Sequence, residues 1–531
     1  MTVPCERFSS VGAGDTPLLF PSITIDESPH WRIGLAISAF AALVLLLPVA
    51  NAQYLPPAVT AALDAAGVSP EALALTVLPV MAGPALLERN EAVPFQPAST
   101  MKLVTTVAAL DLLGANYRGK TELLASGRIS NAVLHGNIYL RGLADADLDM
   151  PTLWSLLYKL HGLGVRKIHG NIILDRSFFS PARIDLGLPP FDESPEWQYN
   201  VIPDALYLNG GLLRYALESN DQAVRVRMEP PMFGVTVRSR MKLSALECKK
   251  WEKGWLPAKV DLMPHTHRVR ISLQGEFPIN CKADAELQLF DRDLLANRLI
   301  RQLWADMGGS LRGRVVNGVV SDKVRLLANH ESRPLAEVLR HMNKSSDNPL
   351  TRLLFLSLGA KAPGELRERF ATTREASAAR VTEWLANHDI STDGLVLDNG
   401  SGLSRSERIT ATQMASMLRF AWQQNYAPEL LASMPLVGID GTMRNRLKQS
   451  AATGRARIKT GTLRNTTAVA GYVPDADQTM WAISAMINHE KAAAARPALD
   501  ALIDWIAGKS TAELMAESKT FNKLDDEIET R

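Results

Sequence analysis

Residues 97–113 read PASTMKLVTTVAALDLL, an apolar helical stretch that opens on a serine and a lysine. Ser99 and Lys102 are three residues apart, so a helix places both side chains on one face and within reach of each other. A serine in the first helical turn also lies where free backbone N–H groups can stabilise an oxyanion. Lys102 must lose its charge to act as a base, which desolvation or a cationic neighbour can arrange. The stretch therefore predicts a serine nucleophile with a lysine base.

A second Ser-x-x-Lys spacing occurs at Ser239 and Lys242. That segment alternates like a strand, in which residues three apart point to opposite faces. We interpret this copy as a coincidence. A single Ser-x-x-Lys is weak evidence, so the interpretation of Ser99 depends on further motifs.

Ser346-Asp347-Asn348 forms a short polar turn between two helical runs. Such a turn can project Ser346 and Asn348 together into a cleft. By itself the triplet is equally typical of a helix cap.

Lys459-Thr460-Gly461-Thr462 lies on a predicted strand that leads into a hairpin. Lys459 offers a cation for a substrate carboxylate, and Thr460 offers a hydroxyl group. We expect Gly461 to let a ligand lie close against the strand. The N–H group of Thr462 can serve as a second oxyanion donor.

Together the three motifs form the set Ser-x-x-Lys, Ser-Asp-Asn and Lys-Thr-Gly, found in class A β-lactamases and penicillin-binding proteins. The first interval, from Ser99 to Ser346, is 247 residues, which is too long for a compact β-lactamase. The chain resembles the D-alanyl-D-alanine carboxypeptidase/endopeptidase family, the class C low-molecular-mass penicillin-binding proteins, from about Pro56 to Gly508. The segments that carry the resemblance are QPASTMKLVTT, GNIILDRSFF, MNKSSDNPLTRLL, DNGSGLSR, GIDGTMRNR and IKTGTL.

The expected fold is an α/β (α+β) serine penicillin-recognising domain, of the β-lactamase/transpeptidase-like type, split in sequence by a β-rich insertion. Short alternating segments between Gly, Pro and Asn residues mark the insertion, which we expect to be mainly antiparallel. The predicted parts are a signal peptide at 1–52, the two halves of the transpeptidase-like domain at 53–118 and 326–510, the insertion at 119–325 and a flexible tail at 511–531.

The N-terminal segment predicts export. Residues 33–49 are uncharged and apolar, and Ala50-Asn51-Ala52 supplies a small-x-small site for cleavage after Ala52. A retained membrane anchor is the alternative. Export to the periplasm leaves Cys248 and Cys281, for which a disulfide and two buried free thiols are both open.

The resemblance implies a serine DD-peptidase that acts on the D-Ala-D-Ala end of peptidoglycan stem peptides and is acylated by β-lactam antibiotics. Ser99 would be the nucleophile and Lys102 its base. The other implied roles are a proton relay to the leaving amine for Ser346, orientation of the acyl side chain for Asn348 and a hold on the terminal carboxylate for Lys459. No metal or organic cofactor is implied.

The resemblance also suggests pocket residues for the stem peptide. Asp175, in LDRSFF, matches the position thought to meet the free amine of a diaminopimelate-type residue, and Phe179 lies close by. Arg405, in GLSR, is a third candidate. A turn residue that ends a strand is the alternative reading of Asp175.

Composition excludes few functions. With 58 Lys+Arg against 56 Asp+Glu the formal charge is +2, which argues against a nucleic-acid binder. Three cysteines exclude a multi-bridge disulfide scaffold and a four-thiolate zinc site. A non-catalytic wall-binding scaffold and a β-lactamase are the alternatives to the peptidase. The balance of carboxypeptidase and endopeptidase action, a homodimer and peripheral membrane association stay open.

Overall fold

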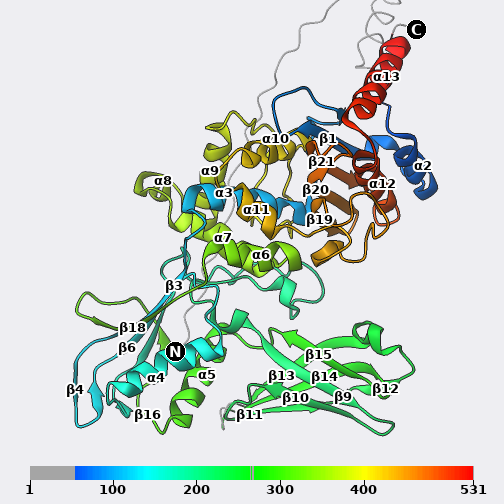
Figure 1. The fold of residues 1–531 in the computed structure, drawn as a ribbon. Coiled ribbons are helices and arrows are strands. Elements are labelled where there is room, and N and C mark those ends of the chain that lie inside the picture. The colour runs from blue at the N-terminus through cyan, green and yellow to red at the C-terminus, as the bar shows by residue number, and fades with distance from the viewer. Residues whose placement is uncertain (1–53, 264, 266–267, 530–531) are drawn as a thin grey trace, which may run out of the picture. The chain divides into compact units, whose positions relative to one another are not determined.

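The computed structural model describes residues 54–529 except 264, 266 and 267 (Figure 1). The predicted signal peptide, residues 1–52, lies outside the described residues. Within the described part no helix is long and apolar enough to cross a membrane.

A five-stranded antiparallel sheet carries the Lys-Thr-Gly motif on its edge strand. The strand order is β19-β20-β21-β1-β2. The bounds are β19 (Arg457–Leu463), β20 (Thr466–Pro474), β21 (Met480–Asn488), β1 (Leu73–Pro79) and β2 (Leu87–Arg89). The hairpin predicted after the motif is therefore confirmed as β20 and β21.

Both faces of this sheet are buried. Along β20, Ala468, Ala470 and Tyr472 enter one apolar cluster, whereas Val469 and Val473 enter another. Successive side chains of a strand point to opposite faces, so each face has its own core. The second cluster packs against α12 (Arg496–Ala507) and α2 (Pro57–Ala66), and the first against α3 (Lys102–Leu113) and α10 (Ala411–Trp422) (Figure 1).

Helix α7 (Asn348–Ala360) is the centre of the helical part. Every one of its residues is buried, which agrees with a sequence, NPLTRLLFLSLGA, that is apolar on nearly all sides. It contacts α3 and α9. The remaining helices of this part are α6 (Leu335–Ser345), α8 (Gly364–Glu368), α9 (Thr373–Ala386) and α11 (Ala427–Ser433).

The segment between α3 and α6 forms four small sheets around a separate apolar cluster. Its elements are β3 (Lys120–Ala125), β4 (Arg128–Ser130), β5 (Val133–His135), β6 (Ile138–Leu143), α4 (Met150–Gly162), β7 (Lys167–Ile168), β8 (Ile172–Asp175), β9 (Leu213–Ser219), β10 (Val224–Glu229), β11 (Val235–Ser239), β12 (Lys242–Ser244), β13 (Trp255–Met263), β14 (Arg268–Pro278), β15 (Lys282–Leu287), α5 (Arg292–Asp306), β16 (Ser310–Leu311), β17 (Val315–Asn317) and β18 (Arg325–Glu331).

The expectation of mainly antiparallel pairing in this segment is wrong for several strands. β6 pairs with β8 in parallel, and β8 pairs with β17 in parallel. Parallel neighbours need a crossover, and α4 supplies the one between β6 and β8. The alternating pattern of single strands carries no information on the direction of their partners.

The two cysteines of the insertion are joined. Cys248 and Cys281 form a disulfide, with their Cα atoms 5.4 Å apart. Of the two alternatives that the sequence left open, the structure has the disulfide.

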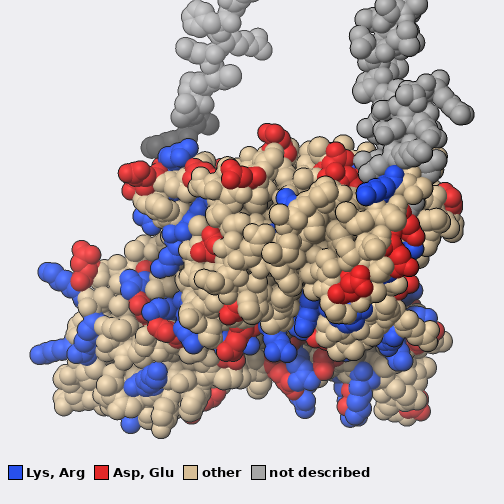
Figure 2. Space-filling model, turned by 45° about the horizontal axis from the view of Figure 1, so that its top comes forward, with Lys and Arg blue, Asp and Glu red and all other residues tan. Residues whose placement is uncertain are grey.

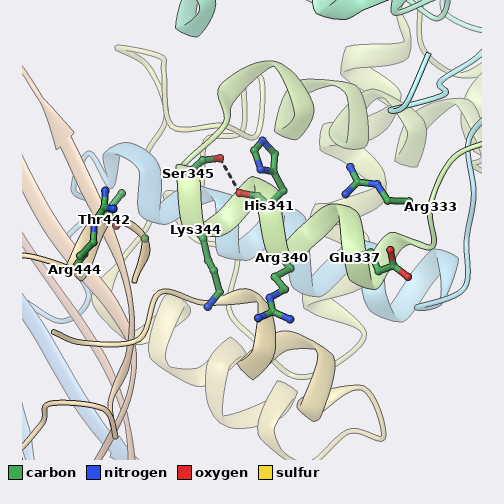
Figure 3. Close-up of a pocket in the computed structure, with 9 residues that line it drawn as sticks. Arg333, Glu337, Arg340, His341, Lys344, Ser345, Thr442 and Arg444 are labelled. Carbon is green, nitrogen blue, oxygen red and sulfur yellow. Dashed lines mark hydrogen bonds between the residues drawn. The ribbon is translucent and has the colours of Figure 1, made fainter. Parts of the chain in front are cut away.

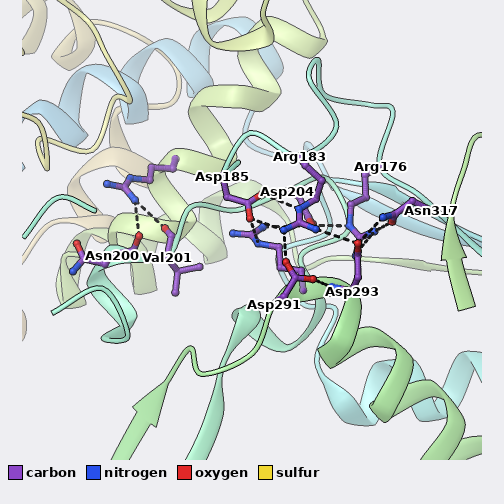
Figure 4. Close-up of polar contacts among 11 residues, drawn as sticks. Arg176, Arg183, Asp185, Asn200, Val201, Asp204, Asp291, Asp293 and Asn317 are labelled. Atoms are coloured by element: carbon purple, nitrogen blue, oxygen red, sulfur yellow. Dashed lines mark hydrogen bonds and ion pairs between the residues drawn. The ribbon is translucent and has the colours of Figure 1, made fainter. Parts of the chain in front are cut away.

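A network of ion pairs holds the long irregular segment that follows β8 (Figure 4). Arg176 contacts Asp204 at 2.7 Å and Asp293, in the first turn of α5, at 3.1 Å. Arg183 contacts Asp185 at 2.8 Å and Asp291, the N-cap of α5, at 2.6 Å. Charged groups thus fix a segment that has little regular secondary structure of its own.

Charges of both signs are interspersed over the face of the molecule seen in Figure 2. That face carries no extended field of one sign, in keeping with the formal charge of +2.

The C-terminal segment differs from the flexible tail expected at 511–531, because helix α13 occupies Thr511–Glu529. Leu514 is fully buried in the cluster under the sheet, and Ser518 Oγ donates to the carbonyl of Leu86 at 2.6 Å. Glu513 accepts from the backbone N–H of Ser510 at 2.8 Å, which caps the first turn. Leu514, the hydrogen bond of Ser518 and the cap together attach this charged helix to the sheet domain.

We expect Leu514→Ala to lower the free energy of unfolding by about 2–4 kcal/mol, because it leaves a cavity in a packed core. Urea unfolding followed by circular dichroism measures this change. Lys519→Ala, on an exposed position of the same helix, is the control. Equal stability of the two variants would contradict the docking of α13.

Candidate active site

Ser99 lies in a short 3-10 helix, η3 (Ala98–Met101), that runs directly into α3. It is half-buried. Ala98 before it has a φ of +47°, a left-handed conformation that is uncommon outside glycine. A Cβ atom at Gly402 would lie 1.9 Å from the carbonyl oxygen of Ala98. The nucleophile is therefore held by a strained turn that a neighbouring glycine leaves room for.

The amine of Lys102 is enclosed by three oxygen atoms. Its Nζ donates to Ser99 Oγ at 3.0 Å, to Asn348 Oδ1 at 2.5 Å and to the carbonyl of Ser401 at 2.5 Å. The side chain is fully buried. Burial, and next the charge of Lys459, hold the pKa of Lys102 well below the ordinary value of lysine. A lysine amine whose pKa is lowered in this way, 3.0 Å from a serine hydroxyl, can accept the hydroxyl proton once it is uncharged.

Ser346 ends α6 in the left-handed conformation, with φ +60°, and so turns its hydroxyl toward β19. The Nζ of Lys459 donates to Ser346 Oγ at 2.7 Å and to the carbonyl of Thr460 at 2.9 Å. Lys459 is fully buried, and burial lowers its pKa to about 7. The site therefore contains a second pair of hydroxyl and amine, Ser346 with Lys459, in addition to Ser99 with Lys102.

The Ser-Asp-Asn turn connects the end of α6 to the start of α7. Asp347 caps α7 by accepting from the N–H of Leu350 at 2.8 Å, so this residue does have the capping role noted as the alternative for the motif. Asn348 starts α7 and accepts from Lys102 through Oδ1. Its Nδ2 donates to the carbonyl of Tyr199 at 3.2 Å, which links the insertion to the site.

Strand β19 presents an open edge to the serine. The N–H of Ile458 points away from β20, since it donates to the carbonyl of Pro435 at 2.9 Å. Strand N–H groups alternate in direction, so the N–H of Thr462 points to the same open side. Thr460 also lies there, and its Oγ1 donates to Thr442 Oγ1 at 2.8 Å.

The structure shows a different reason for a glycine at position 461 from the one expected. A Cβ atom there would lie 2.6 Å from the carbonyl oxygen of Pro97 and 3.1 Å from the nitrogen of Ser99. The glycine therefore lets β19 approach the backbone of the nucleophile, whereas the expectation from the sequence was that it makes room for a ligand.

Asp175 and Phe179 are not placed as substrate contacts. Asp175 is 1% exposed, and its two oxygens accept from the N–H groups of Ser177 and Val320, both at 2.8 Å. Phe179 is buried in the core of the helical part. The turn reading of Asp175 is thus the one that the geometry supports.

Arg405 does line a cavity of about 530 Å³ beside the site. Its guanidinium lies 4.9 Å from the centre of the Phe191 ring. Asn399 and Arg352 also line this cavity, and Arg352 donates to the carbonyls of Asn200 and Val201 at 3.1 and 3.0 Å. We name it the acyl-side cavity, because it adjoins the loop that contacts Lys102.

Sequence reasoning missed Glu407, which shapes that loop. The carboxylate is fully buried and accepts from the backbone N–H groups of Asn399 at 3.0 Å, Gly400 at 2.7 Å and Gly402 at 2.8 Å. The loop so formed presents the carbonyl of Ser401 to Lys102. The one signal for this role in the sequence is that an acidic residue, Glu407, follows the DNGSGLSR segment.

Among the described residues no group of three or more His, Cys, Asp or Glu side chains could hold a metal ion. The chemistry at the site is that of two hydroxyls, two amines and an amide.

Comparison with known proteins now decides the family. The model of the D-Ala-D-Ala carboxypeptidase 3 (S13) family matches residues 58–509. The chain belongs to this family. It is a serine DD-peptidase of the penicillin-binding type, as the sequence motifs predicted.

Proteins similar to this S13 peptidase come from Actinomadura sp. (strain R39) and Haemophilus influenzae. A D-alanyl-D-alanine carboxypeptidase of Actinomadura sp. (strain R39) is 28% identical over 412 residues, which are 75% of this chain and 74% of that protein. The crystal structure of penicillin-binding protein 4 (dacB) from Haemophilus influenzae has a TM-score of 0.67 at 22% identity and covers 88% of this chain and 99% of that one. The structure of the same protein complexed with a novel β-lactam has a TM-score of 0.64 at 22% identity and covers 85% and 99%.

The two lysines predict a bell-shaped pH profile for acylation by a penicillin. The rate constant should rise as Lys102 loses its proton, at a pH well below the ordinary lysine range. It should fall as Lys459, with its pKa lowered to about 7, loses the charge that attracts a carboxylate. In Lys459→Arg this fall in the rate constant should shift to higher pH, because arginine stays charged. Stopped-flow acylation from pH 5 to 10 measures both limbs, and an unmoved alkaline limb in the variant would contradict the assignment.

We expect Glu407→Gln to slow acylation at least tenfold, because an amide cannot accept from all the backbone N–H groups that the carboxylate binds. The unpaired groups should also lower the free energy of unfolding by about 1–3 kcal/mol. Penicillin acylation and urea unfolding measure the two effects. Glu365→Gln, at an exposed position of α8, is the matched control and should change neither.

Proposed function

We propose that this S13 peptidase hydrolyses the D-Ala-D-Ala bond of peptidoglycan stem peptides through an ester on Ser99. The observation that carries the proposal is the buried amine of Lys102, 3.0 Å from Ser99 Oγ, with its pKa held well below that of a free lysine. Attack by a serine hydroxyl on an amide carbonyl needs an uncharged base next to the hydroxyl.

In the first step the neutral Lys102 takes the proton of Ser99, and Ser99 Oγ attacks the carbonyl of the penultimate D-Ala. The N–H groups of Ser99 and Thr462 stabilise the oxyanion, which the open edge of β19 allows. Lys459 and Thr460 hold the terminal carboxylate of the substrate.

In the second half the amine of the terminal D-Ala leaves with a proton relayed through Ser346, which Lys459 keeps in place at 2.7 Å. Water then attacks the ester: its hydroxyl group joins the acyl carbonyl, the bond to Ser99 Oγ breaks, and the other proton of the water restores the serine hydroxyl. Asn348 orients the acyl side chain, and the acyl-side cavity with Arg405 receives the rest of the stem peptide.

A β-lactam presents an amide carbonyl and a carboxylate in a similar arrangement, so it acylates the same serine. The β-lactam complex of the Haemophilus influenzae protein supports this part of the proposal. Asp175 and Phe179 have no part in it.

We propose that the protein acts in the periplasm. The apolar segment at 33–49 with Ala50-Asn51-Ala52 supports export, and the disulfide between Cys248 and Cys281 fits an oxidising compartment. A homodimer and peripheral attachment to the membrane stay predictions, which gel filtration and vesicle sedimentation would test.

Labelling of the purified protein with a fluorescent penicillin, followed by peptide mapping, tests the proposal. The adduct is expected on the peptide that carries Ser99, and Ser99→Ala should lose it completely while it still folds. Ser239→Ala, in the second Ser-x-x-Lys copy, is the matched control and should label like the wild type. A folded wild type without an adduct would favour the non-catalytic scaffold.

A further inference from the structure

Helix α7 carries a buried arginine one turn after Asn348. Arg352 and Asn348 are four residues apart, so their side chains lie on the same face of the helix. Arg352 is 7% exposed, and its Nη1 donates to the carbonyls of Asn200 and Val201 at 3.1 and 3.0 Å (Figure 4). The helix therefore places a guanidinium on the side of the site where Asn348 meets Lys102.

The hydrogen bonds of Arg352 do not balance its charge. The two groups that accept from its Nη1 are uncharged carbonyls, and its buried Nε has no hydrogen-bond partner among the described residues. A cation that is moved out of water is costly unless an opposite charge offsets it. We therefore looked for an anion in the same part of the interior.

The carboxylate of Glu407 is this anion. It is fully buried, and each of its oxygens accepts from backbone N–H groups, as the ionised form does. Burial lowers the pKa of Arg352 to about 10, and the charge of Glu407 is the largest influence that opposes this fall. The two residues thus form a pair of opposite charges in the interior.

Both charges act on Lys102, in opposite senses. Its pKa is lowered first by burial and next by the charge of Lys459, and the charge of Arg352 acts in the same direction. Asp347 and Glu407 act against these influences, since an anion favours the charged amine. Two cations and two anions therefore face the base, from β19, from α7, from the turn before α7 and from the loop that ends at Glu407.

A further titratable group, His341, lies near one of these anions. It is exposed on α6 and lines an open groove with Arg340 and Lys344 (Figure 3). Its Nε2 lies 3.9 Å from Oδ2 of Asp347, so its charge acts first on that carboxylate. The pH dependence of the base has to be measured with and without this histidine.

We infer that Arg352 is a positioning residue for the catalytic base: its guanidinium offsets the buried carboxylate of Glu407, which would otherwise hold the proton on the Lys102 amine. The inference rests on the proposed function, in which Lys102 takes the proton of Ser99. Glu407 is needed to shape the loop that contacts Lys102, and its charge opposes the loss of a proton from that amine. The buried arginine lets the site keep the loop without this cost.

The test measures the rate constant of penicillin acylation from pH 4 to 9 in Arg352→Met, which keeps much of the apolar volume of the side chain and removes its charge. We expect the acid limb, where Lys102 loses its proton, to shift to higher pH, because the loss of a nearby cation favours the charged amine. Below the midpoint of the wild-type acid limb the rate constant should fall about fivefold more than it falls at pH 8. A loss of packing alone would lower the rate constant by the same factor at every pH.

A second variant tests the charge balance from the other side. Glu407→Gln removes the anion and should move the acid limb to lower pH, whether or not Arg352→Met folds. Arg352→Met/Glu407→Gln should return the acid limb toward its wild-type position, because both opposing charges are gone. Circular dichroism shows which of the variants are folded.

Two controls isolate the effect of Arg352. Arg367→Met removes the same charge from an exposed position of α8 and should keep the wild-type acid limb. In a His341→Gln background the shift caused by Arg352→Met should persist, because it does not depend on the histidine.

Fluorescent penicillin labelling of the same samples separates this inference from the proposed function. Labelled, folded variants of Arg352 and Glu407 whose acid limbs coincide with that of the wild type would overturn the role of Arg352 alone. A wild type that is not labelled at Ser99 would overturn the proposed function and this inference together.

Discussion

The burial of one lysine amine is the constraint on which the rest of the site depends. Lys102 Nζ meets a hydroxyl, an amide and a main-chain carbonyl that come from η3, from the start of α7 and from the loop around Ser401. Three oxygen acceptors surround the amine and fix its position. Desolvation and the nearby Lys459 then disfavour its charge. The groups that bury the amine of Lys102 thus determine both its position and its lowered pKa.

The enclosure requires backbones to approach more closely than side chains permit. Gly461 brings β19 against Pro97 and Ser99, and Gly402 brings the loop against Ala98. The buried carboxylate of Glu407 gathers the N–H groups of that loop, so that the carbonyl of Ser401 faces Lys102. A charged group without contact to the reacting atoms therefore sets the geometry of the base.

The insertion belongs to the site as well as to its own core. The carbonyl of Tyr199 accepts from Asn348, and the carbonyls of Asn200 and Val201 accept from Arg352 of α7. The ion pairs of Arg176 and Arg183 with α5 hold this irregular segment in place (Figure 4). The cavity beside the site is therefore lined by residues of the insertion, such as Asp185 and Phe191, as well as by Arg352 and Arg405 of the helical part.

The sequence by itself determined the chemistry, since Ser99 and Lys102 at helical spacing, Ser346 in a turn and Lys459 on a strand are local patterns whose geometry follows from the backbone. It also determined the hairpin of β20 and β21, through two apolar runs around a turn. Only the tertiary structure decided which groups each of these side chains contacts. Asp175 turned inward, Glu407 became a support and Leu514 docked a helix expected to be a flexible tail, because burial and hydrogen bonding depend on segments far apart in the chain.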